Sequence, residues 1–191
     1  SDGGVHSSDN HYLALMEMAQ KNGFSKNNLF FHAVMDGRDT PPTNGVHYLE
    51  KLQDKINALG VGQIASICGR YFLMDRDKRW DRVAKAYNAL TIGEGVKETS
   101  ALEAINNAYK KGETDEFIKP IVITQDNQPI GLIKDNDSII FFNFRADRAR
   151  EITSAFTQPF PVNDTYSKST ASDKFSATSI RNEAERAGLT E

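Results

Sequence analysis

The chain has 191 residues, of which 39% are hydrophobic and 26% are charged, and its formal net charge is −3. This composition is typical of a soluble globular protein, and the lack of a basic excess argues against a general nucleic-acid-binding protein. The single cysteine, Cys68, excludes an internal disulfide framework, and no stretch reaches the roughly 20 apolar residues that span a bilayer. We therefore expect a cytoplasmic protein without a membrane partner. The sequence starts at Ser1 without a methionine and looks like the interior of a longer protein.

Helix and strand signals alternate through the first half of the chain. Apolar residues at helical spacing predict a helix around residues 12–19, and the apolar run Leu29–Met35 predicts a buried strand. A second helical pattern covers residues 49–59 and ends at Gly60. It is followed by a second short strand, Ile64–Cys68.

The second half continues in the same way. Helical patterns are centred on Trp80–Tyr87, on the segment after Ser100, and on Ile152–Phe156. Three apolar runs predict further strands: Ile121–Ile123, Ile130–Ile133 and Ser138–Phe142. The alternation predicts an α/β fold in one domain, with an open, largely parallel sheet and helices on both faces. Pro159 closes the last clear element, and only a short helix near Ile180–Ala187 is expected beyond it.

Arginines follow three of the predicted strands within a few residues, and a helix follows each time. Arg38 comes after the first strand, Arg70 and Arg76 after the second, and Arg145 and Arg148 after Ser138–Phe142. Ligands of open α/β sheets bind beyond the carboxyl ends of the strands, where helix N-termini add free N–H groups. Because guanidinium groups bind carboxylates and phosphates bidentately, this spacing predicts a site for a small polyanion such as a phosphorylated acid.

The residues alone leave other interpretations open. Arginines beside aspartates often form surface ion pairs worth about 0–1 kcal/mol, and the interleaved acids are expected to orient the guanidinium groups. Arg79 and Arg150 are weaker candidates, and Arg82 is expected to be solvated or in a structural ion pair. The interleaved acids are Asp36, Asp75, Asp77 and Asp147.

Histidines and one further aspartate complete the candidate set. His6 lies in a glycine-rich turn, where contact with a ligand and a local hydrogen bond are equally compatible with its chemistry. Asp39 either accepts a proton from a substrate hydroxyl or caps a turn. His32 is expected to be a core histidine with its hydrogen bonds satisfied. The histidines show no metal-ligand spacing, so no metal is expected in this chain.

Five motifs, in order along roughly residues 1–157, resemble the cofactor-independent phosphoglycerate mutases. They are S-D-G-G-V-H-S at 1–7, D-G-R-D-T-P-P at 36–42, G-R-Y-F-L-M-D-R-D-K-R-W at 69–80, T-D-E-F-I at 114–118 and F-N-F-R-A-D-R at 142–148. Members of that family have two domains. One resembles the alkaline phosphatases and holds two divalent metals, usually manganese, with a serine nucleophile; the other is inserted into it and binds the substrate.

The resemblance implies that residues 1–161 are the inserted substrate-binding domain and that 162–191 are a divergent tail or domain edge. The family interconverts 3-phosphoglycerate and 2-phosphoglycerate through a phosphoserine. Because the serine and metal motifs are missing, this chain is expected to be inactive alone and to depend on a phosphatase-like domain. Matching motif by motif implies an acid/base role for Asp39 and substrate contacts for seven residues: His6, Arg38, Asp39, Arg70, Arg76, Arg145 and Arg148.

Two other functions fit the same arginine pattern. One is a free-standing module that binds phosphorylated acids without a catalytic partner. The other is a relative of the phosphopentomutases, although the dense matches at Met74–Trp80 favour the phosphoglycerate mutases. Nucleic-acid binding is the weakest interpretation, because the charge balance opposes it.

Overall fold

A computed structural model of the chain describes residues 2–157. Residues Ser1–Ile152 form one compact unit and Thr153–Glu191 a second, of which only 153–157 are described. The expected helix near Ile180–Ala187 and the proposed tail 162–191 lie outside the described residues. Among the described residues, no helix is both long and apolar enough to cross a membrane.

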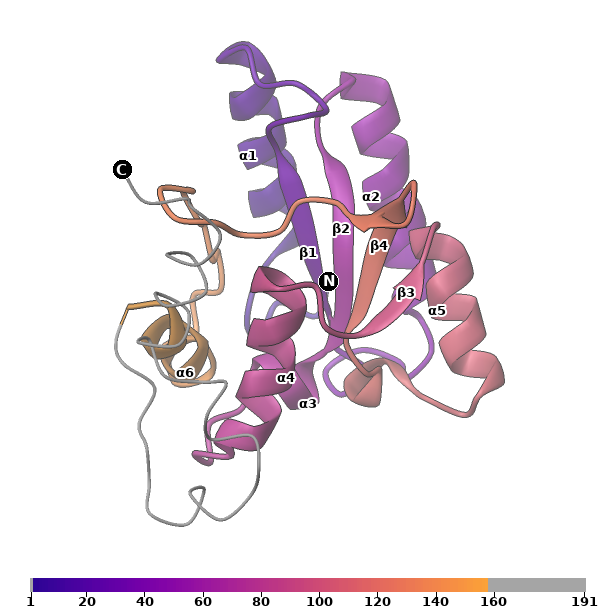
Figure 1. The fold of residues 1–191 in the computed structure, drawn as a ribbon, viewed down its shortest axis with the longest axis vertical. Coiled ribbons are helices and arrows are strands. Elements are labelled where there is room, and N and C mark those ends of the chain that lie inside the picture. Colours follow the sequence, from indigo (N-terminus) through magenta and orange to yellow (C-terminus); the bar gives the residue numbers. More distant parts are fainter. Residues whose placement is uncertain (1, 158–191) are drawn as a thin grey trace. The chain divides into compact units, whose positions relative to one another are not determined.

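Helices and strands alternate along the chain, and the strands form an open sheet in the order β1-β2-β4-β3, with β5 paired to β4 (Figure 1). β1 runs parallel to β2, and β3 runs parallel to β4, whereas β4 is antiparallel to β2 and β5. The predicted α/β class is confirmed, and the sheet is mixed. The elements are α1 (Asp9–Lys21), β1 (Phe30–Met35), α2 (Gly45–Leu59), β2 (Gln63–Gly69), α3 (Arg70–Leu73), α4 (Trp80–Thr91), β3 (Val96–Glu98), α5 (Ala101–Lys110), the 3-10 helix η1 (Asp115–Phe117), β4 (Ile121–Gln125), β5 (Gln128–Pro129) and α6 (Ala146–Thr157).

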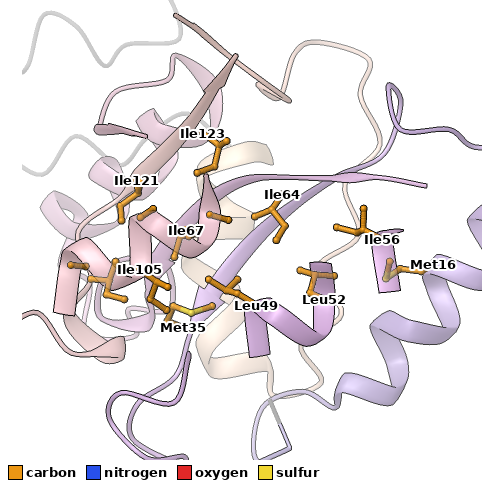
Figure 2. Packing of buried hydrophobic residues seen from close by; sticks show 14 residues of the cluster. Met16, Met35, Leu49, Leu52, Ile56, Ile64, Ile67, Ile105, Ile121 and Ile123 are labelled. Carbon is orange, nitrogen blue, oxygen red and sulfur yellow. The ribbon is translucent and has the colours of Figure 1, made fainter. Parts of the chain in front are cut away.

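The main apolar core lies between one face of the sheet and the helices α1, α2 and α5. Figure 2 shows Leu49 of α2 and Ile105 of α5 close to Ile67 of β2. Ile121 and Ile123 of β4 belong to this cluster. The buried Val122 between them points to the opposite face, because side chains alternate along a strand. On that face α4 packs against β2 and β4, so helices cover both faces.

A bulge in β2 keeps its apolar residues on the core side. Phe31 pairs with Ile64 and His32 pairs with Ser66, so β2 carries one extra residue, Ala65, between the two pairings. In a regular strand Ile64 and Ile67, three residues apart, would point to opposite faces; because of the bulge both join the core. β2 is therefore fixed in register, and it ends at Gly69, directly before Arg70.

Two of the predicted strands are wrong. Residues 130–133 follow the very short strand β5, and residues 138–142 form no strand in the described structure. Ile139 and Ile140 are 49% and 64% exposed, so this apolar run does not mark a buried strand. Instead Phe142 lies beside α1, where its ring is 6.1 Å from the ring of Tyr12.

Candidate functional site

Two of the predicted arginine loops, those that carry Arg38 and Arg70, meet at one edge of the sheet. Because β1 and β2 are parallel, the loop after Met35 and the first residue of α3 emerge side by side. The Oδ1 atom of Asp36 accepts the backbone N–H groups of Arg38 at 3.2 Å and of Asp39 at 3.0 Å. This turn, which is typical of aspartate, leaves the Arg38 side chain 65% exposed.

Arg70 is the buried centre of the site, with only 4% of its surface exposed. Its Nη1 donates to Asp36 Oδ1 at 2.7 Å and to Asp39 Oδ2 at 2.6 Å. Burial disfavours the charged guanidinium, but the hydrogen bonds and negative charges of Asp39 and Asp36 outweigh burial and raise the pKa of Arg70. Arg70 therefore stays charged, and two carboxyl groups hold its guanidinium in place.

His6 completes this buried cluster. Its Nε2 lies 2.9 Å from Nη2 of Arg70 and 3.1 Å from Oδ2 of Asp39. Burial and the positive charge of Arg70 lower the pKa of His6, so the ring is neutral near pH 7. Because a guanidinium only donates, Nε2 can accept from Arg70 only when the ring proton sits on Nδ1. Within residues 2–157, that buried Nδ1 has no hydrogen-bond partner.

A cleft of about 270 Å³ opens beside this cluster. Five arginines line it, together with three acids and two aromatic rings. Sequence analysis predicted four of these arginines and placed Arg82 among the structural pairs. The lining residues are Arg38, Arg70, Arg76, Arg82, Arg148, Asp75, Asp77, Glu116, Tyr71 and Phe117.

Arg145 is not among the residues that line the cleft, but it is tied to one of them. Asp147 accepts from Arg145 Nε at 2.8 Å and from Arg76 Nη1 at 2.9 Å, so one carboxylate holds both guanidinium groups. The hydrogen bonds from Arg145 and Arg76 lower the pKa of Asp147 to about 2. The segment that carries Arg145 is held here by a 2.8 Å hydrogen bond from the Phe144 N–H to the His6 carbonyl. It does not follow a strand end as predicted.

Arg148 of α6 approaches the same cleft from the other side. Its Nη1 donates to the Met74 carbonyl at 3.0 Å, while its buried Nε has no partner among residues 2–157. Burial lowers the pKa of Arg148, and neighbouring positive charges lower it further: Arg76, Arg70 and Arg145. These four guanidinium groups are therefore close enough to repel one another, which favours binding of a multiply charged anion.

One acidic partner of a cleft arginine was not predicted from the sequence. Glu116 of η1 lies 3.5 Å from Nη1 of Arg38, although its motif carried no predicted role. Arg82 does form the expected structural pair, with Asp75 at 3.2 Å, and its guanidinium carbon also lies 3.8 Å from the centre of the Tyr71 ring. Only the long-range contact, across 78 residues, reveals Glu116 as the partner of Arg38.

Other singled-out residues stay outside the cleft. His32 Nδ1 lies 2.8 Å from the Ser66 hydroxyl, and burial lowers the pKa of His32 to about 4, as expected of a neutral core histidine. Cys68 is buried, and burial raises the pKa of its thiol. Among residues 2–157, no group of three or more histidine, cysteine, aspartate or glutamate side chains is arranged to hold a metal ion.

Comparison with known proteins gives one consistent family. A family model described as "BPG-independent PGAM N-terminus" matches residues 1–182. A 2,3-bisphosphoglycerate-independent phosphoglycerate mutase of Lachnoclostridium phytofermentans is 56% identical over 156 residues, covering 82% of this chain and 30% of that protein. The protein of the same name in Desulforudis audaxviator is 50% identical over 157 residues, with the same two shares.

A solved structure agrees with these matches. The Leishmania mexicana phosphoglycerate mutase, crystallised at low cobalt concentration, superposes with a TM-score of 0.79 at 34% identity. The match covers 87% of this chain and 32% of that one. The chain thus spans about 30% of the length of the relatives it matches.

Proposed function

The chain belongs to the 2,3-bisphosphoglycerate-independent phosphoglycerate mutase family, as an N-terminal part of such a protein, and from this premise we propose that it binds and orients phosphoglycerate. The whole protein would interconvert 3-phosphoglycerate and 2-phosphoglycerate in glycolysis and gluconeogenesis. The observation that carries the proposal is the cleft lined by Arg38, Arg70, Arg76 and Arg148. A phosphoglycerate carries both a phosphate and a carboxylate, and several arginines at one cleft suit such a ligand.

Seven residues are proposed as substrate contacts or near neighbours of the substrate. Exposed guanidinium groups are the natural first contacts of the anion, and the buried Arg70 fixes the innermost positive charge. Arg145 would contribute after releasing Asp147. The proposed set is His6, Arg38, Asp39, Arg70, Arg76, Arg145 and Arg148.

Asp39 is the proposed acid/base residue. Its Oδ2 is held by Arg70 and lies beside His6, while its side chain keeps 26% exposure toward solvent. A carboxyl group in that position can protonate the glycerate oxygen that the phosphoryl group leaves, and can take the proton of the other hydroxyl when that hydroxyl attacks phosphorus as the group returns. Phosphoryl transfer needs mainly such positioning and charge stabilisation from the binding part.

The nucleophile and the metals are proposed to lie in the rest of the longer protein. There a serine would take the phosphoryl group, two divalent ions would stabilise its charge, and the glycerate would turn within the arginine cleft before the group returns. We expect those ions to be manganese, in a domain of the alkaline phosphatase type in the cytoplasm. The 191-residue chain alone would then lack mutase activity, and full turnover by this chain with Mn²⁺ would contradict the proposal.

Calorimetric titration of the 191-residue chain with 3-phosphoglycerate at low salt tests the binding claim. We expect weak binding, because part of the site is missing, and at least a tenfold loss in Arg38→Ala or Arg76→Ala, about 1.4 kcal/mol. Both side chains are exposed, so their removal leaves the core intact. Arg150→Ala, which removes an equal charge from an exposed position of α6, is the matched control. Equal binding by all four proteins would reject the cleft.

The alternative is a free-standing module that binds phosphorylated acids. The same arginine-lined cleft supports it, because such acids carry the same charged groups. Titration with other phosphorylated carboxylic acids separates the two functions. A mutase domain should prefer the two phosphoglycerates, whereas a general module should bind acids of different length equally well.

A further inference from the structure

Three successive contacts join the loop Met74–Arg79 to the first turns of α6. Arg76 pairs with Asp147 at 2.9 Å, Arg148 donates to the Met74 carbonyl at 3.0 Å, and the Lys78 N–H donates to Glu151 Oε1 at 2.9 Å. Asp147 and Glu151 are four residues apart, so they lie on one side of the helix. Lys78 and Glu151 are 73 residues apart in the sequence. Two distant motifs are thus held together along one face of α6.

The third contact differs from the other two because its carboxyl group, that of Glu151, is buried. Only 8% of its surface is exposed, and its Oε2 is buried without a hydrogen-bond partner among residues 2–157. It does not line the cleft. Burying a carboxyl group costs free energy. The hydrogen bond from the Lys78 N–H offsets part of that cost.

The loop residue that Glu151 holds has an unfavourable backbone conformation. Lys78 has φ = 58°, in the left-handed region that non-glycine residues rarely adopt. Such a conformation persists only when neighbours fix it, and here the carboxyl group of Glu151 accepts the Lys78 N–H. On the inner side Asp75 accepts the N–H groups of Asp77 and Arg79, each at 2.9 Å, so two carboxyl groups define the loop.

The acidic neighbours of Glu151 come from the loop itself. Burial raises the pKa of Glu151, and the carboxylates of Asp75 and Asp77 raise it further. Glutamine at this position would keep a carbonyl oxygen at the same reach for the Lys78 N–H, and would put an amide NH₂ group in place of the second carboxyl oxygen.

We propose that Glu151 is a positioning residue: it fastens the loop that carries Arg76 to the helix that carries Arg148, and so holds both guanidinium groups at one cleft. It acts through Lys78 and touches no ligand itself. The inference rests on the proposed function, because it assigns Glu151 a part in the same phosphoglycerate site.

Two substitutions with opposite expectations test it in the 191-residue chain. Glu151→Gln keeps the acceptor at full length, so 3-phosphoglycerate should bind within about twofold of the unchanged chain. Glu151→Asp keeps the acid but shortens it by one methylene, so the Lys78 contact is lost and binding should fall at least fivefold, about 1 kcal/mol. Glu50→Asp, at an exposed position of α2, is the control for the same shortening.

Hydrogen exchange of the Lys78 amide gives a readout that needs no ligand. This amide should stay protected in Glu151→Gln and lose protection in Glu151→Asp, while amides of β2 stay protected in both. If the unchanged chain itself does not bind 3-phosphoglycerate but Lys78 behaves as expected, the proposed function fails and the role of Glu151 in holding the loop stands. If the unchanged chain binds and Glu151→Gln does not, the inference fails. Unchanged Lys78 protection in Glu151→Asp, or loss of binding in Glu151→Gln with retained binding in Glu151→Asp, would overturn the inference.

Discussion

The two walls of the arginine cleft are built in different ways. On one wall the ends of β1 and β2 pack backbone to backbone against η1, where a side chain on Gly69 would lie 2.3 Å from the Glu116 carbonyl oxygen. On the other wall, loop 74–79 is held to α6 by side-chain hydrogen bonds and ion pairs. The first wall tolerates no added atom, whereas the second can loosen while the core stays folded. Stability and ligand binding should therefore respond to different substitutions.

The largest effect is expected from Gly69→Ala on the packed wall. The new Cβ meets backbone atoms of Glu116, which cannot turn aside as a flexible side chain would, so we expect a loss of about 3 kcal/mol or more in unfolding free energy. Gly112→Ala is the control: its φ is +80° but no atom lies within 4 Å, so only backbone strain of about 1–2 kcal/mol applies. Urea unfolding measures both, and a smaller loss for Gly69→Ala would contradict the packed-wall account.

A medium effect is expected from Tyr109→Phe behind the same wall. The Tyr109 hydroxyl donates to Asp115, whose surface is 1% exposed and whose other oxygen accepts the Gly45 N–H at 2.8 Å. Without the hydroxyl, one buried carboxylate oxygen loses its donor, at a cost of about 2 kcal/mol.

Thermal or urea unfolding of Tyr109→Phe measures this loss. Tyr48→Phe is the matched control, because its hydroxyl donates to Asp2 in an exposed hydrogen bond. Equal stability of the two variants would show that Asp115 does not support the wall.

The smallest effect concerns the pH dependence of the second wall. Burial raises the pKa of Glu151 above its ordinary value of 4.5, so the folded chain binds more protons than the unfolded chain above that pH. Stability from this group is complete below pH 4.5 and is lost as pH rises through the folded pKa. Glu151→Gln does not titrate, so its stability relative to the unchanged chain should rise with pH from 4.5 upward. A difference that is constant with pH, measured by urea unfolding, would contradict a raised pKa.

The predictable part of the site depends on one pair of strands. Arg38 and Arg70 meet because β1 and β2 are parallel and end at one edge, a relation that the apolar runs in the sequence already indicate. Asp36 and Asp75 each hold a guanidinium group as expected: Asp36 accepts from Arg70 and Asp75 from Arg82.

The unpredictable part depends on contacts between distant segments. Arg145 was placed near the site through a strand that does not form, and it arrives there through the Phe144–His6 hydrogen bond instead. Glu116 lies 78 residues from Arg38, and no spacing rule relates them. The strand β3 was missed because Val96–Glu98 is only three residues long and largely exposed, so it lacks an apolar pattern.

The central claim is that distant guanidinium groups meet at a single anion, and NMR titration of the arginine Nε–H signals with 3-phosphoglycerate tests it most directly. We predict that the signals of Arg38, Arg70, Arg76 and Arg148 shift together with one dissociation constant, while Arg150 stays unchanged. Shifts with different dissociation constants, or shifts confined to one of these arginines, would contradict a common site.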